Sequence, residues 1–446
     1  MAHPTASRFV QALAAIAASA VLLAGCSFAS ATAADLEAEL DGQVALFDSA
    51  VLHGIDVTFD DADYDQLIAD YVETGEKSWI AATVVIDGIR FEDAGIRLKG
   101  NSSLFGLNSS TAGNPEDLPW LIRLDKYIDG VDHQGYTDIV IRSNSTETAL
   151  NEAVAQELLA VAGLANQDPI ATAFTVNGGE TELRLAVEHP DDVWDDANFD
   201  DDDGVLYKAD SEGDYSYRGD DPEAYEEVFG QKAGDDDYEP LISFLDFVNN
   251  SDDATFNEEL ANRLDLDAFA TYLAFQDLIG NADDIDGRGN NSYLHYDYES
   301  EQFTVVSWDL NLAFNTANVG GGGGPGGAGG DVAAAGGRGD RPGGGARPER
   351  VAPGADAGVL PGAGAAGPGG GGSNVLVDRF MANAEFVELY NTKTAELTER
   401  LFTSGTAAST IADWSDLLAA DASDLVDTTT LTAEAAALTA FIAAQS

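Results

Sequence analysis

Three short stretches in the second half of the chain decide the fold class: LIGNADD at 278–284, NNSYL at 290–294 and VSWDLN at 306–311. The first ends a helix predicted over 264–280, where apolar side chains recur at helical spacing. The other two belong to runs that flank a polar turn and are predicted to pair as strands. Together they predict a helix, a loop rich in Asp and Asn, and a hairpin that returns to that loop.

Three side chains around this loop and hairpin are candidates for catalysis. Asp283 follows the predicted helix, Asn291 precedes the first strand, and Asp309 ends the second. Phosphoryl transfer by a kinase needs one Asp that orients or deprotonates the hydroxyl, and an Asn and a second Asp that hold Mg²⁺. Magnesium prefers hard oxygen ligands, which Asn and Asp supply. The hairpin would bring Asn291 and Asp309 together, as such a site requires.

The same loop has two other interpretations. An Asp- and Asn-rich segment also serves as a plain turn between two elements. A calcium-binding loop fits less well, because Asp284 and Asp286 are followed by Gly287 and the final Glu of the calcium pattern is missing. From the residues alone, a plain turn and a transfer site both remain open.

Basic side chains at two strand ends of the N-terminal half form a second candidate group. The segments are IRLKGNSS at 96–103 and WLIRLDKY at 120–127. Lys99 and Arg97 precede a turn of small residues whose backbone amides can approach phosphates, and Arg123 lies on the neighbouring strand. We expect these three side chains to contact the phosphates of a nucleotide. The alternative for each is a salt bridge with one of the many carboxylates.

A kinase also pairs its phosphate-binding basic residue with a helix glutamate. The helix predicted over 146–162 offers Glu152 and Glu157. At about 100° per residue, Glu157 lies on the face of Leu150 and Val154, and Glu152 lies roughly opposite. A carboxylate on a core-facing stripe needs a partner, so Glu157 is the preferred candidate.

The remaining patterns predict an α+β fold with one long insert. Asp87-Gly88 and Asn177-Gly178 separate runs rich in Val and other apolar residues, which is a strong hairpin signal. The acidic run 191–203 is predicted to be a solvated loop, and 375–402 to form one or two helices. Residues 319–372 are dominated by Gly, Ala and Pro, cannot bury enough surface to offset their ordering entropy, and are predicted to be disordered.

The N-terminus predicts export and membrane attachment. An apolar run from Phe9 to Ala24 follows Arg8 and is shorter than the roughly 18 residues of a membrane span. It ends in LAGC, whose Cys26 is the only cysteine of the chain. This pattern predicts a lipoprotein signal peptide over 1–25, a lipid on Cys26 and a tether over 26–45. The protein is then expected on the extracytoplasmic side of the cell membrane; an ordinary cleaved signal peptide is the alternative.

The charge of the chain bounds its partners. Its 446 residues include 79 acidic and 21 basic side chains, which gives a net charge of −58. Nucleic-acid binding needs Lys and Arg to neutralise phosphates, so we expect no nucleic-acid partner. Such a surface attracts cations and basic protein segments. General solubility or adaptation to salt is the simpler explanation of the charge.

In this order the motifs resemble the spore coat protein H (CotH) family of atypical protein kinases. The similarity runs from about residue 50 to 402 and is interrupted by the Gly-rich insert. Three departures stand at family positions: Asn290 for a common His, Asn311 for a second Asp, and Pro119-Trp120 near a common Lys. The matching segments are RLKGNSS (97–103), LDKY (124–127), VNG (176–178), VE (187–188), LYK (206–208), NAD (281–283), NSYL (291–294) and WDL (308–310).

The resemblance implies an atypical protein-kinase-like domain over 46–446 that binds ATP and Mg²⁺. It implies phosphorylation of Ser or Thr in secreted or surface proteins, possible substrates being basic and Ser-rich. By position, Asp283 would be the catalytic Asp, Asn291 and Asp309 the metal ligands, and Lys99 or a basic neighbour the phosphate contact. The alternative functions are a non-catalytic surface module of the same family and, less favoured, a calcium-dependent adhesive lipoprotein.

Overall fold

The computed structural model describes most of the chain beyond residue 43. It divides the chain into Met1–Ala45 and Leu46–Ser446, and all elements below belong to the second unit. The predicted signal peptide, Cys26, most of the tether and the insert at 319–372 lie outside the described residues. Those residues are 44–108, 111–199, 204–210, 213–281, 283–286, 291–318 and 374–445.

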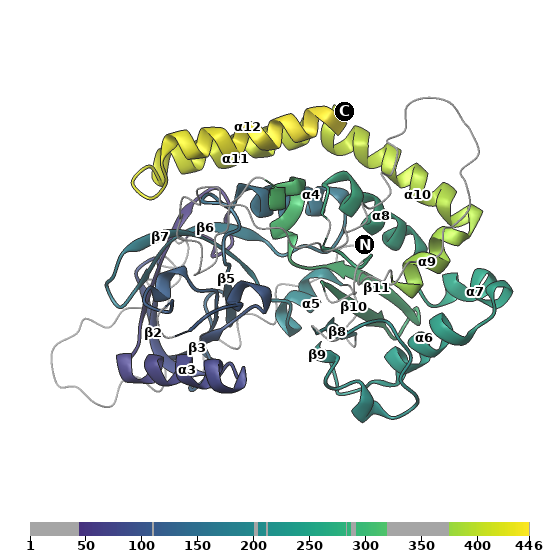
Figure 1. Cartoon of the computed structure of the whole chain (residues 1–446), viewed down its shortest axis with the longest axis horizontal. Coiled ribbons are helices and arrows are strands. Elements are labelled where there is room, and N and C mark those ends of the chain that lie inside the picture. Colours follow the sequence, from purple (N-terminus) through teal and green to yellow (C-terminus); the bar gives the residue numbers. More distant parts are fainter. Residues whose placement is uncertain are drawn as a thin grey trace, which may run out of the picture. The chain divides into compact units, whose positions relative to one another are not determined.

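Seven strands of the N-terminal half close into a barrel in the order β1-β2-β3-β4-β5-β7-β6 (Figure 1). Neighbouring strands are antiparallel except β1 and β6, which run parallel and complete the closure. The predicted α+β class is confirmed, but the closed barrel was not predicted. The strands are β1 (Leu52–Thr58), β2 (Ile80–Ile86), β3 (Ile89–Leu98), β4 (Trp120–Arg123), β5 (Asp138–Ile141), β6 (Pro169–Val176) and β7 (Thr181–Glu188).

Both predicted hairpins of the barrel are confirmed. Asp87 and Gly88 join β2 to β3 with φ values of 49° and 84°, and Asn177 and Gly178 join β6 to β7 with 50° and 67°. Two successive residues at positive φ match the right-handed twist of the paired strands, and Asn, Asp and Gly tolerate that conformation best. The turn residues therefore fix the register of both pairs.

A second, four-stranded sheet has the order β11-β10-β8-β9. Helix α8 (Leu266–Leu278) and the hairpin of β10 and β11 are confirmed as predicted, and the short 3₁₀ segment η5 (Leu310–Asn318) follows β11. Helices α6 (Glu239–Asn250), α7 (Asp253–Glu259), α9 (Val375–Ala382) and α10 (Ala384–Leu397) also belong to this half (Figure 1). The strands are β8 (Val205–Ala209), β9 (Phe229–Ala233), β10 (Ser292–Asp297) and β11 (Gln302–Ser307).

The predicted solvated loop at 191–203 is wrong over most of its described part. Helix α5 (Asp192–Asn198) begins there, and the Asp191 side chain caps it by accepting from the backbone N–H groups of Val193 and Trp194. Trp194 is 1% exposed. Burial of this large apolar side chain favours an ordered helix over a solvated loop.

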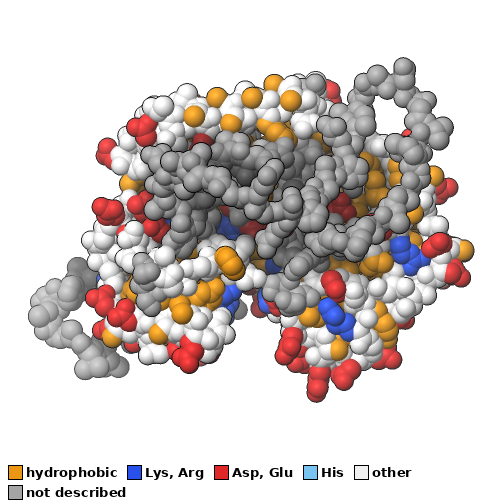
Figure 2. All heavy atoms as spheres, in the orientation of Figure 1, with side chains coloured by type: hydrophobic (Ala, Val, Ile, Leu, Met, Phe, Trp, Pro, Cys, Tyr) orange, Lys and Arg blue, Asp and Glu red, His pale blue; other side chains and the backbone are white. Residues whose placement is uncertain are grey.

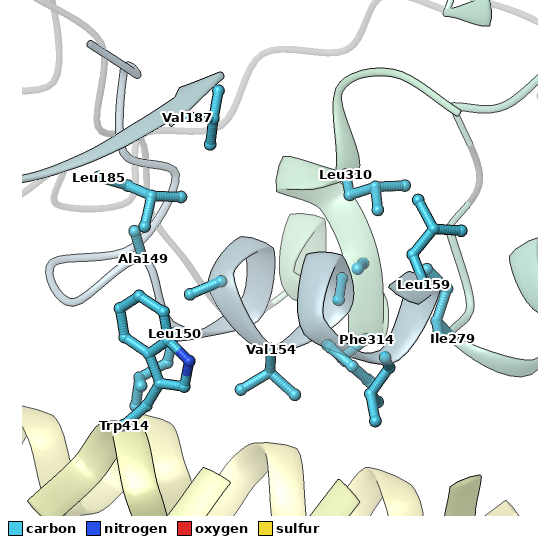
Figure 3. Packing of buried hydrophobic residues seen from close by; sticks show 14 of the residues in the cluster. Ala149, Leu150, Val154, Leu159, Leu185, Val187, Ile279, Leu310, Phe314 and Trp414 are labelled. Atoms are coloured by element: carbon cyan, nitrogen blue, oxygen red, sulfur yellow. The ribbon is translucent and has the colours of Figure 1, made fainter. Parts of the chain in front are cut away.

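Helix α4 (Leu150–Ala162) lies between the barrel and the C-terminal helices α11 (Thr406–Asp421) and α12 (Thr428–Gln445). Figure 3 shows its apolar side chains among Leu185 of β7, Leu310 and Phe314 of η5, and Trp414 of α11. Ten of its 13 residues are buried, because neighbours cover it on several sides. The helix therefore links the barrel to the segment that follows Asp309.

The segment that leads into α4 bonds to a distant part of the chain. The N-cap residue, Ala149, has no side-chain cap, and the first helical N–H group, that of Leu150, donates to the Thr148 hydroxyl at 3.2 Å. The Glu434 carboxylate of α12 accepts from the backbone N–H groups of Glu147 and Thr148, each at 3.1 Å, and from the Thr148 hydroxyl. A negative charge there also interacts favourably with the helix dipole.

None of the described helices combines the length and the hydropathy that a bilayer-spanning segment needs.

Candidate functional site

The loop after α8 and the hairpin of β10 and β11 bring Asp283, Asn291 and Asp309 together. Ser292 pairs with Ser307, so Asn291 and Asp309 lie at the same end of the hairpin. The Asn291 side-chain N–H group donates to the backbone carbonyl of Asp283 at 2.9 Å. Burial and the negative charge of Asp309 raise the pKa of Asp283, and a hydrogen bond from Asn291 lowers it. Two carboxylates that repel each other beside an amide form a donor set that suits a hard cation.

The backbone of Asp309 adopts a left-handed conformation with φ of 63°. Asp adopts this conformation more readily than most residues other than Gly and Asn. It places the carboxylate beside Arg142, whose Nη2 bonds to Asp309 Oδ1. The fold therefore stabilises the position of this carboxylate with an ionic contact.

Arg142 connects Asp309 to helix α4. Its guanidinium Nε lies 2.8 Å from Glu152 Oε1, and its centre lies 5.4 Å from the Trp308 ring. Arg142 is 9% exposed and Glu152 2%. Burial alone would lower the pKa of Arg142, but the charges of Glu152 and Asp309 raise it above its ordinary value. Sequence reasoning missed Arg142, although it follows a buried strand just as Lys99 does.

The glutamate of α4 with a basic partner is Glu152, not Glu157 as expected. Glu157 is half-buried and has no ionic partner among the described residues. The helical-wheel argument assumed one core-facing stripe, whereas α4 is covered by the barrel, η5 and α11. The first turn of α4 faces Arg142. The face that carries Glu152, which was expected to face solvent, is therefore buried.

Lys99 lies among other cations near the same site. Its Nζ is 5.1 Å from the centre of the Trp308 ring, and no carboxylate pairs with it among the described residues. Burial holds the pKa of Lys99 well below its ordinary value, and four nearby cations lower it further. An anionic ligand would relieve this concentration of positive charge. The four cations are Arg97, Arg142, Lys208 and Lys232.

Arg97 and Arg123 both lie beside the Trp79 ring, at 5.0 Å and 5.6 Å from its centre. Arg123 forms a bidentate pair with Asp138, Nε to Oδ1 at 2.7 Å and Nη2 to Oδ2 at 2.5 Å. Arg97 Nε is buried and has no hydrogen-bond partner in the described parts of the chain. Arg123 therefore forms a salt bridge, which was the alternative to a phosphate contact. Arg97, like Lys99, has no carboxylate partner among the described residues.

These clusters are set in an acidic surface. On the face drawn in Figure 2, Asp and Glu side chains are widely spread, whereas several Lys and Arg side chains lie near the centre.

A pocket of about 440 Å³ lies on the second sheet and its helices, and its lining includes Glu239, Arg263 and Tyr298. None of its lining residues belongs to the clusters described above.

Comparison with known proteins identifies the family. Residues 96–439 match the model of the family described as CotH kinase protein. Among solved structures, the crystal structure of a Helicobacter pylori proinflammatory kinase, CtkA, matches at 13% identity with a TM-score of 0.22. That match covers 40% of this chain and 53% of that one, and a likeness this low carries no detail of the site across. No curated protein matches the chain. The family match covers well over half of the sequence, and this protein therefore belongs to the CotH kinase family.

Proposed function

We propose that this protein is an atypical kinase that transfers the γ-phosphate of ATP to Ser or Thr hydroxyls of envelope or extracellular proteins. The proposal rests on one observation: an acidic cluster (Asp283, Asn291 and Asp309) lies close to a cationic cluster around Lys99. Arg142 contacts Asp309 of the acidic cluster and lies near Lys99 of the cationic cluster. A kinase needs this combination, because the nucleotide brings phosphates and a metal ion to one place.

The acidic cluster fits Mg²⁺ by its donor set of two carboxylates and an amide. Asn291 and Asp309 would hold the ion, which when bound neutralises charge on the phosphate oxygens. Asp283 would take the proton of the substrate hydroxyl as that oxygen forms its bond to the γ-phosphorus and the bond to ADP breaks. Its raised pKa makes its carboxylate a better proton acceptor than an ordinary Asp.

The cationic cluster would hold the phosphates. Lys99 is the first candidate, because it has a depressed pKa and no carboxylate partner among the described residues. Arg97 is the second. The Glu152–Arg142 pair would position Asp309 from helix α4, as a link between the phosphate and metal sides of the site.

The location and substrates rest on the sequence. A lipid on Cys26 would anchor the protein to the membrane on its extracytoplasmic face. The net charge of −58 favours basic protein substrates, including Ser-rich ones, because opposite charge speeds their encounter.

The test is phosphate transfer from radiolabelled ATP with Mg²⁺, using the purified chain alone and with a basic Ser-rich protein. We expect labelling by the wild type and at least a ~100-fold loss in Asp309→Asn, since the ion loses its negatively charged ligand. Asn retains an oxygen that Arg142 can bond, so the fold should survive. The matched control is Asp253→Asn, whose side chain is 97% exposed and which should label like the wild type.

Equal labelling by the wild type and Asp309→Asn would refute the metal site. If neither labels any protein and ATP produces no shift in melting temperature, the non-catalytic surface module becomes the better description of this protein.

A further inference from the structure

A third cluster lies where strands β5 and β7 end beside helix α5. Asp138 begins β5, His189 follows β7, and Asp191 caps α5. One ligand atom from each of these residues lies within 4.8 Å of the others. Ile139 pairs with Glu188 across the two strands, so Asp138 and His189 face each other in register. The backbone therefore holds the three side chains at one corner of the barrel.

One nitrogen of the buried His189 imidazole has no partner among the described residues. His189 is 9% exposed, and it is Nδ1 that lacks a hydrogen-bond partner there. Buried polar atoms are nearly always bonded, and an exception calls for an explanation such as an absent ion. The two carboxylates near this nitrogen make a bound metal ion a fitting explanation.

Both carboxylates retain free coordination capacity. Asp191 Oδ1 accepts from the N–H groups of Val193 and Trp194, each at 3.1 Å, and these bonds leave Oδ2 available. The two oxygens of Asp138 accept from Arg123, and each has a second lone pair. Arg123 thus orients Asp138 in the way that outer partners orient metal ligands.

We propose that Asp138, His189 and Asp191 bind one divalent transition-metal ion of the zinc class, at a site separate from Asp283, Asn291 and Asp309. One imidazole and two carboxylates suit Zn²⁺, which takes such donors at about 2.0–2.2 Å and prefers four ligands. Donor atoms within 4.8 Å need only a small inward rotation to reach those distances. The ion would join β5, β7 and α5, and its fourth position would face solvent or a ligand.

Four cations lie near His189, and their charge opposes the approach of another cation. The two carboxylates of the site offset the positive field that Arg123 and the other cations create. These cations are Lys99, Arg123, Lys232 and Arg97.

The test is metal titration of the full chain, purified without a polyhistidine tag and stripped with a chelator. Calorimetry with Zn²⁺, in salt high enough to suppress loose binding to the acidic surface, should find one tight site. Co²⁺ in its place should give the visible absorption band of a low-symmetry site. Neither readout depends on kinase activity, so the result stands apart from the proposed function.

Two variants remove one ligand each. His189→Gln should weaken Zn²⁺ binding at least ~10-fold and abolish the Co²⁺ band. Asp191→Asn keeps a side chain that caps α5 and should weaken Zn²⁺ similarly, which covers the case in which His189→Gln fails to fold. The matched control is His133→Gln, at a second buried histidine of the barrel, 6% exposed, and it should bind like the wild type. Equal Zn²⁺ affinity in all four proteins, or displacement of Zn²⁺ by equimolar Mg²⁺, would overturn the site.

Discussion

His53 and Asp87 form an ion pair at the turn between β2 and β3. Nδ1 of His53 lies 2.7 Å from Asp87 Oδ2, and the histidine is fully buried. Burial alone would lower the pKa of His53, but the hydrogen bond and the charge of Asp87 raise it above its ordinary value. The pKa of Asp87 is lowered, since its bonds with His53 and Gly54 outweigh its burial.

These shifts give the pair a defined pH window. A raised His pKa contributes stability that is full below the ordinary His pKa and is lost as pH rises through the raised one. A lowered Asp pKa contributes stability that is lost only in stronger acid. We expect Asp87→Asn to lower the free energy of unfolding by about 1 kcal/mol near pH 5.5, and by much less near pH 9. Asn tolerates the positive φ of this turn, so the turn itself is preserved.

Urea unfolding at both pH values measures this difference. Asp93→Asn is the control, because Asp93 is exposed, also has a positive φ of 54°, and has no histidine partner. An equal loss at both pH values in Asp87→Asn would mean that the pair contributes nothing through its charges.

At the scale of elements, helix α4 carries the ionic contact on which the candidate site depends. We expect Glu152→Gln to cost about 3 kcal/mol of unfolding free energy, because it leaves the buried Arg142 with one carboxylate instead of two. Glu157→Gln, on the same helix but half-buried and without an ionic partner among the described residues, should change it by less than ~0.5 kcal/mol. Chemical denaturation of both variants checks the pair, and equal costs would show that burial of the helix, not the Arg142 contact, dominates.

The elements that could be predicted are those with local signals. Turn chemistry at Asp87-Gly88 and Asn177-Gly178 defined two hairpins, and the spacing of apolar side chains defined α8. The parallel contact of β1 with β6 has no local signal, since it joins segments more than 100 residues apart. Helix α5 was missed because the many acidic residues of this segment predicted a solvated loop, and the burial of its single large apolar residue, Trp194, has no signal in the sequence.

The contacts of the candidate site were also predictable only where a local sequence signal exists. The meeting of Asn291 with Asp309 follows from a hairpin and was predictable from its flanking residues. The pairing of Glu152 with Arg142 was not predictable, because a helical wheel does not show how many neighbouring elements cover α4. The contact of Arg142 with Asp309 spans 167 positions and depends on the whole tertiary arrangement.

Across the whole molecule, an excess of 58 negative charges opposes compaction. Repulsion between exposed carboxylates weakens when salt shortens the Debye length from ~30 Å at 0.01 M to ~8 Å at 0.15 M. We expect the free energy of unfolding to rise by roughly 1–2 kcal/mol between these conditions, with a matching rise in melting temperature. Thermal melts in NaCl and in choline chloride measure it, and the two salts should act alike. A melting temperature that falls with salt would show that specific ion pairs outweigh the general repulsion.

The contact of Glu434 with the segment before α4 has a consequence for the order in which the chain folds. A ribosome makes residues 147 and 148 nearly 290 positions before it makes their acceptor. Until Glu434 has been made, the backbone N–H groups of these two residues, which directly precede α4, lack this acceptor. We therefore expect the barrel strands to pair before α12 docks, and the docking of α12 to order the segment that leads into α4.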